Sequence, residues 1–252
     1  MDGLGIGLIV MCALLAILFI VARCLKGGLL GVVLKTIASF GFVTSGIIGL
    51  IVSDATTIKG ILWGSGDYAK WILGLIVIGL VLGMIGDIIL DLKVVYPGND
   101  KYFLNTGMGS FFLGHVCYII AFTLWARPLA HVSSAFTVWE AVLGGVGLAV
   151  VGTIGIVLSS KKMGLTFGNY IVQTISYTLI LTFTMFYCLL LAIFFGSGLW
   201  LSFVAMLVFF LSDVVLSMQY FGGKIASKPL IAINHALYYA AQIMLVAVIF
   251  AF

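Results

Sequence analysis

Eight long apolar runs determine what this chain can fold into. A helix that crosses a membrane needs roughly 20 mostly apolar residues. The sequence offers such runs at about 4–22, 29–52, 71–90, 108–126, 134–158, 169–194, 199–220 and 229–252. Membrane strands would need short alternating segments, and no linker here is long enough for a soluble domain. We therefore expect an all-α membrane protein, with residues 1–252 forming a single domain of eight transmembrane helices.

The composition excludes the common classes of soluble protein. Hydrophobic residues make up 63% of the chain and charged residues only 8%, whereas about a quarter of a soluble domain is charged. A nucleic-acid-binding surface would need a density of basic residues that the chain lacks. The four cysteines have no C-x-x-C spacing, so we interpret them as small packing residues.

The loops differ in their content of Lys and Arg, which indicates an orientation. The connections after spans 1, 3, 5 and 7 contain Arg23, Lys26, Lys93, Lys101, Lys161, Lys162, Lys224 and Lys228. The other connections contain Lys59, Lys70 and Arg127. Because cytoplasmic loops carry an excess of Lys and Arg, this split of eight to three predicts that both termini are exoplasmic. We expect a multi-pass protein of the cell membrane.

The two halves of the chain repeat a pattern of polar residues. Span 3 contains Gly86-Asp87-Ile-Ile-Leu90 and span 7 contains Ser212-Asp213-Val-Val-Leu216. The span after each contains His-x-x-Tyr, at 115–118 and again at 235–238. Four spans separate the copies, so both run in the same direction. This favours a parallel four-plus-four repeat, although coincidence in an apolar sequence is an alternative.

Ionisable groups inside the spans fall at one depth. Each costs on the order of 2.5–3.5 kcal/mol to insert, so each needs a reason. With a rise of about 1.5 Å per residue, five of the six lie in the cytoplasmic half: Lys35, Asp87, His115, Asp213 and His235. Glu140 lies near the opposite face and is expected to reach the outer interface. A shared depth predicts one polar cavity, and a structural ion-pair network is the alternative.

The last span adds a polar stripe to this cavity. His235, Tyr238, Tyr239 and Gln242 follow the i, i+3, i+4, i+7 spacing of one helical face, and Asn234 adjoins them. Two carboxylates in a dry cavity form a candidate acid–base pair, since desolvation favours the neutral form and a nearby cation the charged form. If only one of the two contacts Lys35, that carboxyl group favours its charged form and the other favours its neutral form.

Other chemistries lack their signatures. No G-x-S-x-G is present, and Ser212 has no triad context. A zinc site needs three ligands close together, whereas His131 lies in a loop far from the other two histidines. We expect no metal and no cofactor.

Four motifs together resemble a known family. They are Gly86-Asp87-Ile-Ile-Leu90, the segment from Gly107 through Ser110, His115 and Tyr118 to Phe122, Phe210-Leu-Ser212-Asp213-Val-Val-Leu216, and Tyr238-Tyr239-Ala-Ala-Gln242. In this order and spacing they are similar to the YhhN-type lysoplasmalogenases, over spans 2 to 8. The family's lysine in span 2 usually precedes proline, whereas Lys35 precedes Thr36.

The resemblance implies an activity and roles for residues. Characterised members are eight-span proteins that hydrolyse the vinyl-ether bond of lysoplasmalogens to a fatty aldehyde and a glycerophospho-ethanolamine or -choline. It implies Asp87 and Asp213 as the catalytic pair. As supporting or substrate-binding residues we expect Lys35, His115, Tyr118, Ser212, Asn234, His235, Tyr238, Tyr239 and Gln242. Many relatives are bacterial, so we expect a bacterial membrane, with a lysophospholipid substrate that enters from the bilayer and no nucleic-acid partner.

Two other functions remain open at this point. A small-molecule or proton-coupled transporter would also explain a repeat and charges within the membrane. A transporter should have polar residues near both faces of the membrane, whereas five of the six ionisable residues within the spans lie in its cytoplasmic half. A non-catalytic lipid-binding scaffold is the third possibility.

Overall fold

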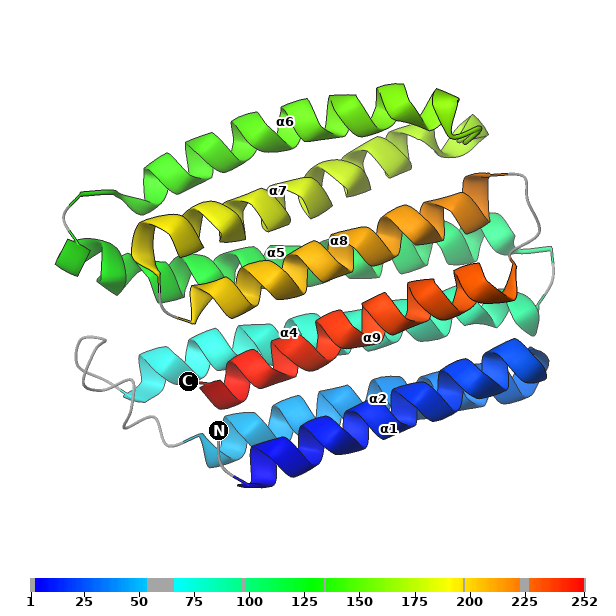
Figure 1. Ribbon diagram of the computed structural model, residues 1–252, viewed down its shortest axis with the longest axis horizontal. Coiled ribbons are helices and arrows are strands. Elements are labelled where there is room, and N and C mark those ends of the chain that lie inside the picture. The colour runs from blue at the N-terminus through cyan, green and yellow to red at the C-terminus, as the bar shows by residue number, and fades with distance from the viewer. Residues whose placement is uncertain are drawn as a thin grey trace.

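In the computed structural model the described residues (3–53, 66–96, 98–133, 135–196, 198–222 and 227–251) form a bundle of long helices (Figure 1). The long helices are α1 (Gly3–Leu25), α2 (Gly28–Val52), α4 (Gly66–Asp91), α5 (Asp100–Ser133), α6 (Val138–Lys162), α7 (Ile171–Phe195), α8 (Leu199–Phe221) and α9 (Lys228–Ala251). Two short 3-10 helices, η1 (Leu92–Val94) and η2 (Gly168–Tyr170), precede α5 and α7. All eight long helices are long and apolar enough to cross a membrane, which confirms the all-α fold of eight spans.

The helices begin and end within a few residues of the predicted spans, with one exception. The helix predicted at 108–126 extends over 34 residues in α5. Its first two turns contain Asp100, Lys101 and Asn105, and its last two contain Arg127 and His131, so hydropathy alone missed both ends. The prediction that His131 lies in a loop is therefore wrong, because His131 lies in the last turn of α5. Of the residues used to predict the orientation, Lys59 and Lys224 lie outside the described residues, as does Phe252 at the end of the last predicted span.

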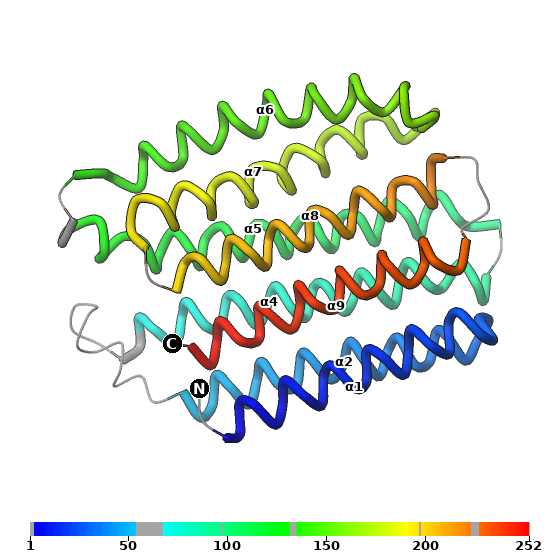
Figure 2. Tube along the Cα trace, in the orientation of Figure 1, coloured from blue at the N-terminus to red at the C-terminus, as the bar shows by residue number. Residues whose placement is uncertain are grey.

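The two termini lie at the same end of the bundle (Figure 2). The opposite end, here called the distal end, contains the connections α1–α2, α4–α5, α6–α7 and α8–α9 (Figure 1). These are the connections for which the Lys and Arg count predicts a cytoplasmic location. That orientation stays a prediction.

Apolar side chains cover the outside of the bundle, as a lipid environment requires. Leu14 on α1 is 62% exposed, and Leu143 and Val151 on α6 are 72% and 70% exposed. Helices α1 and α6 have few buried residues, whereas α9 has many. The polar residues in the middle of α9, from Asn234 to Gln242, are buried inside the protein.

Helices pack in the same order in the two halves of the chain. In each half the first helix packs on the second, the second on the third and the third on the fourth: α1, α2, α4, α5 and then α6, α7, α8, α9. Between the halves, α5 packs on α7 and, in the corresponding way, α9 packs on α2. This order supports the parallel four-plus-four repeat.

The tightest contact between α4 and α5 depends on Gly79. A Cβ atom at Gly79 would lie 2.3 Å from the ring of Tyr118, which is only 2% exposed. We expect Gly79→Ala to destabilise the protein by about 1–3 kcal/mol, because the buried ring has no room to move. Gly74→Ala, on the same helix with nothing within 4 Å of its added Cβ, is the matched control. Thermal unfolding in detergent measures both, and equal melting temperatures would contradict this packing.

Candidate functional site

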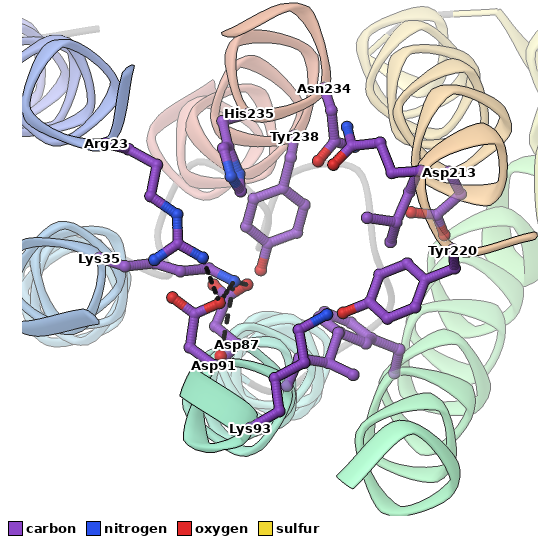
Figure 3. Close-up of a pocket in the computed structure, with 14 residues that line it drawn as sticks. Arg23, Lys35, Asp87, Asp91, Lys93, Asp213, Tyr220, Asn234, His235 and Tyr238 are labelled. Carbon is purple, nitrogen blue, oxygen red and sulfur yellow. Dashed lines mark hydrogen bonds and ion pairs between the residues drawn. The ribbon is translucent and has the colours of Figure 1, made fainter. Parts of the chain in front are cut away.

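A polar pocket of about 140 Å³ lies at the distal end of the bundle, surrounded by α1, α2, α4, α5, α8 and α9 (Figure 3). Its lining residues are Arg23, Lys35, Asp87, Leu90, Asp91, Lys93, Phe111, Asp213, Leu216, Gln219, Tyr220, Asn234, His235 and Tyr238. Both aspartates singled out from the sequence line it, and Figure 3 shows them across the pocket from one another.

Asp87 is held by contacts on both carboxylate oxygens. The ammonium of Lys35 lies 3.2 Å from Oδ1, and the hydroxyl of Ser39 donates a 2.6 Å hydrogen bond to Oδ2. The Tyr239 hydroxyl lies 3.0 Å from the Ser39 hydroxyl and 3.1 Å from the backbone carbonyl oxygen of Lys35, and it has one proton to donate to either of them. Asp87 is therefore a buried carboxylate with a direct cationic partner.

A second ion pair extends this network to α1. Lys35 also lies 3.4 Å from Oδ1 of Asp91, and the same oxygen is 3.1 Å from Nη2 of Arg23. Asp91 is one helical turn beyond Asp87 on α4, so the two carboxylates lie on one face of the helix. Lys35 and Arg23 are thus each paired with a carboxylate.

Asp213 has a different environment. The hydroxyl of Tyr177 on α7 donates to its Oδ2, and Ser212 Oγ lies 3.4 Å from its Oδ1. In the described part of the chain no Lys or Arg comes within ion-pair distance of Asp213. The two aspartates of the repeat are therefore unlike: one is paired with a cation and the other with a phenol.

The polar stripe of α9 lies at different depths in the site. Asn234, His235 and Tyr238 line the pocket, and the Tyr238 hydroxyl points towards Asp87 (Figure 3). Tyr239 does not line the pocket and acts on it through Ser39. Gln242 is fully buried near Gly83 and the Tyr238 hydroxyl, and neither of its amide atoms has a hydrogen-bond partner among the described residues.

Five of the expected supporting residues do not line the pocket: Tyr239 and Gln242, described above, and His115, Tyr118 and Ser212. The ring of His115 packs edge-on against Phe209, 4.8 Å between centroids, and Tyr118 packs against Gly79. The Ser212 hydroxyl donates back to the carbonyl of Phe209. The His115 ring also lies near Tyr177 on α7, at 6.4 Å between centroids, so it packs among aromatic side chains and does not line the pocket.

Five polar residues of the pocket were not predicted from the sequence: Arg23, Asp91, Lys93, Gln219 and Tyr220. Arg23, Asp91 and Lys93 were assigned to connections because they follow the apolar runs, and Gln219 and Tyr220 were not considered. The spacing of Asp91 from Asp87, one turn on the same helix, was the signal that could have identified Asp91. Tyr177, the partner of Asp213, carried no signal in the sequence.

An apolar groove adjoins the polar pocket. It lies between α5, α7 and α8, and α7 packs against both α5 and α8. It extends about 10 Å along α7, from Thr174 to Leu181. Asp213, Leu90, Phe111, Leu216 and Tyr220 line both cavities. Asp213 therefore lies at the junction of a polar and an apolar space.

These features define an integral membrane protein with a candidate acid–base site between its helices. In the described part of the chain, no three His, Cys, Asp or Glu side chains are close enough to hold a metal ion together. The family model for the YhhN family matches residues 62–249, and the chain belongs to this family. The match confirms the resemblance in the motifs; it includes both aspartates and begins after the helix that carries Lys35. No curated protein and no solved structure matches the chain.

Proposed function

We propose that the protein hydrolyses the vinyl-ether bond of lysoplasmalogens, releasing a fatty aldehyde and a glycerophospho-ethanolamine or -choline. One observation carries the proposal: two carboxyl groups in unlike environments face the same pocket, next to an apolar groove. Membership of the YhhN family supports it. An enzyme that acts on a single-chain lipid needs both a polar and an apolar space.

Asp213 is the proton donor in this proposal, and Asp87 is the anion. A desolvated carboxyl group without a cation favours its neutral form, whereas one that contacts an ammonium favours its charged form. Lys35 at 3.2 Å keeps Asp87 ionised. Within the described ranges the polar side chains in contact with Asp213 are those of Tyr177 and Ser212, and neither is a cation. This division of roles is the one that general acid catalysis by paired carboxyl groups requires.

The reaction proceeds in two stages. Asp213 transfers its proton to the β-carbon of the vinyl ether, and the α-carbon and ether oxygen become an oxocarbenium ion that the Asp87 carboxylate stabilises. Water then adds to the α-carbon and gives up a proton, which restores Asp213 and forms a hemiacetal. The hemiacetal breaks its carbon–oxygen bond to the glycerol, leaving the aldehyde and the glycerophospho-alcohol. Tyr238 lines the pocket and orients the water, and Gln242 lies beside the Tyr238 hydroxyl.

The apolar groove accommodates the alkenyl chain. Because Asp213 lines its inner end, a chain lying in the groove places its first carbons beside the proton donor. The charged residues of the pocket share the distal end of the bundle. A transporter needs polar contacts towards both ends of its path, so this one-sided arrangement favours the hydrolase over the transporter.

A reaction in heavy water tests the function and the site of protonation together. We expect purified protein in detergent to release aldehyde from a lysoplasmalogen, and the aldehyde formed in D₂O to carry one deuterium on the carbon next to the carbonyl. Mass spectrometry of the rapidly reduced product measures this label. The saturated 1-O-alkyl lipid, which has no double bond to protonate, is the control. Release of unlabelled aldehyde would exclude protonation at the β-carbon.

A further inference from the structure

Three cations line the pocket, and two of them are already bound to carboxylates. Arg23 contacts Asp91 at 3.1 Å, and Lys35 contacts Asp87 at 3.2 Å and Asp91 at 3.4 Å. Within the described ranges Lys93 makes no ion pair with a carboxylate. The pocket thus contains one cation that is available to an external anion.

The position of Lys93 fits such a role. It belongs to η1, which follows α4 directly, so its side chain enters the pocket from the distal end. Figure 3 shows it extending between Asp91 and Tyr220. Its ammonium lies 3.8 Å from the centroid of the Tyr220 ring. A cation–π contact holds an ammonium in place without neutralising its charge, so Lys93 is positioned and still charged.

Lys93 and Tyr220 lie between two spaces. Both line the polar pocket, and both also line a wider hollow of about 610 Å³ at the distal end. A lysophospholipid whose reacting bond reaches the aspartates extends its glycerol and phosphate from there towards the outside of the bundle. The phosphate of such a lipid therefore comes to the boundary where Lys93 lies.

We propose that Lys93 recognises the phosphate of the lipid substrate, whereas Lys35 stays bound to Asp87 and Asp91. This inference rests on the proposed lysoplasmalogen hydrolysis, because it takes the reacting bond to lie at Asp213. Lysine binds phosphate as a compact point charge with three donors. Tyr220 keeps the ammonium at the pocket entrance until the phosphate displaces the ring contact. The lysine thus selects phospholipids over neutral ether lipids of the same chain.

Binding to lipids that cannot be hydrolysed tests the inference separately from catalysis. The probes are a saturated 1-O-alkyl-glycerophosphoethanolamine and the matching 1-O-alkylglycerol, which lacks the phosphate. We expect Lys93→Gln to weaken binding of the phospholipid about tenfold, as loss of a charge-assisted hydrogen bond does, and to leave binding of the alkylglycerol unchanged. Lys93→Arg should restore most of the phospholipid affinity. Calorimetric titration in an uncharged detergent measures the affinity of each lipid for the wild-type protein and for each variant.

Two controls test whether the loss of affinity is specific to Lys93 and to a lipid phosphate. Lys161→Gln removes the same charge from an exposed position at the distal end, and it should not change either affinity. Inorganic phosphate at millimolar concentration should not displace the phospholipid; displacement would mean that the site takes free phosphate and would overturn the lipid assignment. Equal loss of both lipids in Lys93→Gln, or no loss of either, would also overturn it. If aldehyde release fails while the phosphate-selective loss is observed, the proposed reaction is wrong and the role of Lys93 stands.

Discussion

Asp213→Asn will reduce the rate of vinyl-ether hydrolysis by about 10²–10⁴-fold, the contribution typical of a general acid. Asparagine has nearly the shape of the aspartic acid and can still accept the hydrogen bond from Tyr177, so the pocket should keep its structure. It has no acidic proton to give to the β-carbon. The loss should therefore appear in kcat, with little change in KM, when aldehyde release is followed at saturating lipid.

Asp87→Asn tests the other half of the pair. It removes the anion that stabilises the oxocarbenium ion, and we expect a loss of similar size. The matched control is Glu140→Gln, the same change of carboxyl to amide at the opposite end of the bundle. Glu140 accepts a 2.6 Å hydrogen bond from the backbone of Thr137 at the start of α6, and glutamine serves equally well in such a capping box. Full activity in Asp213→Asn would refute the role of Asp213 as the general acid.

The sequence was sufficient to predict the eight helices because lipid imposes a simple rule. Each span must bury its backbone polar groups within a helix and expose apolar side chains, and both requirements are visible in hydropathy. The error in α5 has the same origin. Its first turns, from Asp100 to Asn105, extend beyond the apolar run, and hydropathy does not distinguish a polar helical turn from a loop.

The sequence predicted the site residues whose insertion into the membrane costs free energy, and it missed those at helix ends, where that cost is small. Lys35, Asp87 and Asp213 lie deep within apolar runs, so each required an explanation. Arg23 and Lys93 lie at helix ends, where a charge is inexpensive in either a loop or a pocket. These two cations belong to the site because α1, η1 and α8 contribute side chains to the same pocket as α4, which the sequence does not show.

The direction of the His115 side chain could not be predicted from the sequence, for a different reason. Depth along a helix follows from residue number, whereas the direction of a side chain depends on which neighbours each face contacts. The repeat related His115 to His235, and only His235 lines the pocket. The same asymmetry appears in the partners of the aspartates, Lys35 in one half and Tyr177 in the other. The two halves therefore place their carboxyl groups in unlike environments.

Lys35→Met will destabilise the protein by about 3–5 kcal/mol, the cost of leaving a buried charge without its partner. Lys35 is 5% exposed and contacts two buried carboxylates, Asp87 and Asp91. Methionine fills a similar volume but offers no charge, and Arg23 reaches only Asp91. Unfolding in mixed detergent micelles measures the loss. Lys162→Met, at an exposed position at the distal end, should change the free energy of unfolding by no more than about 0.5 kcal/mol.

A double substitution separates the unpaired charge from the loss of packing. If the uncompensated carboxylate of Asp87 causes the destabilisation, then Asp87→Asn should recover part of it in the Lys35→Met background. The two substitutions would then be non-additive by about 0.5–3 kcal/mol, as residues in one ion-pair network are. Additive losses would mean that Lys35 acts through its aliphatic stem. In that case Lys35 would no longer account for an ionised Asp87, and the division of roles between the two aspartates would lose its physical basis.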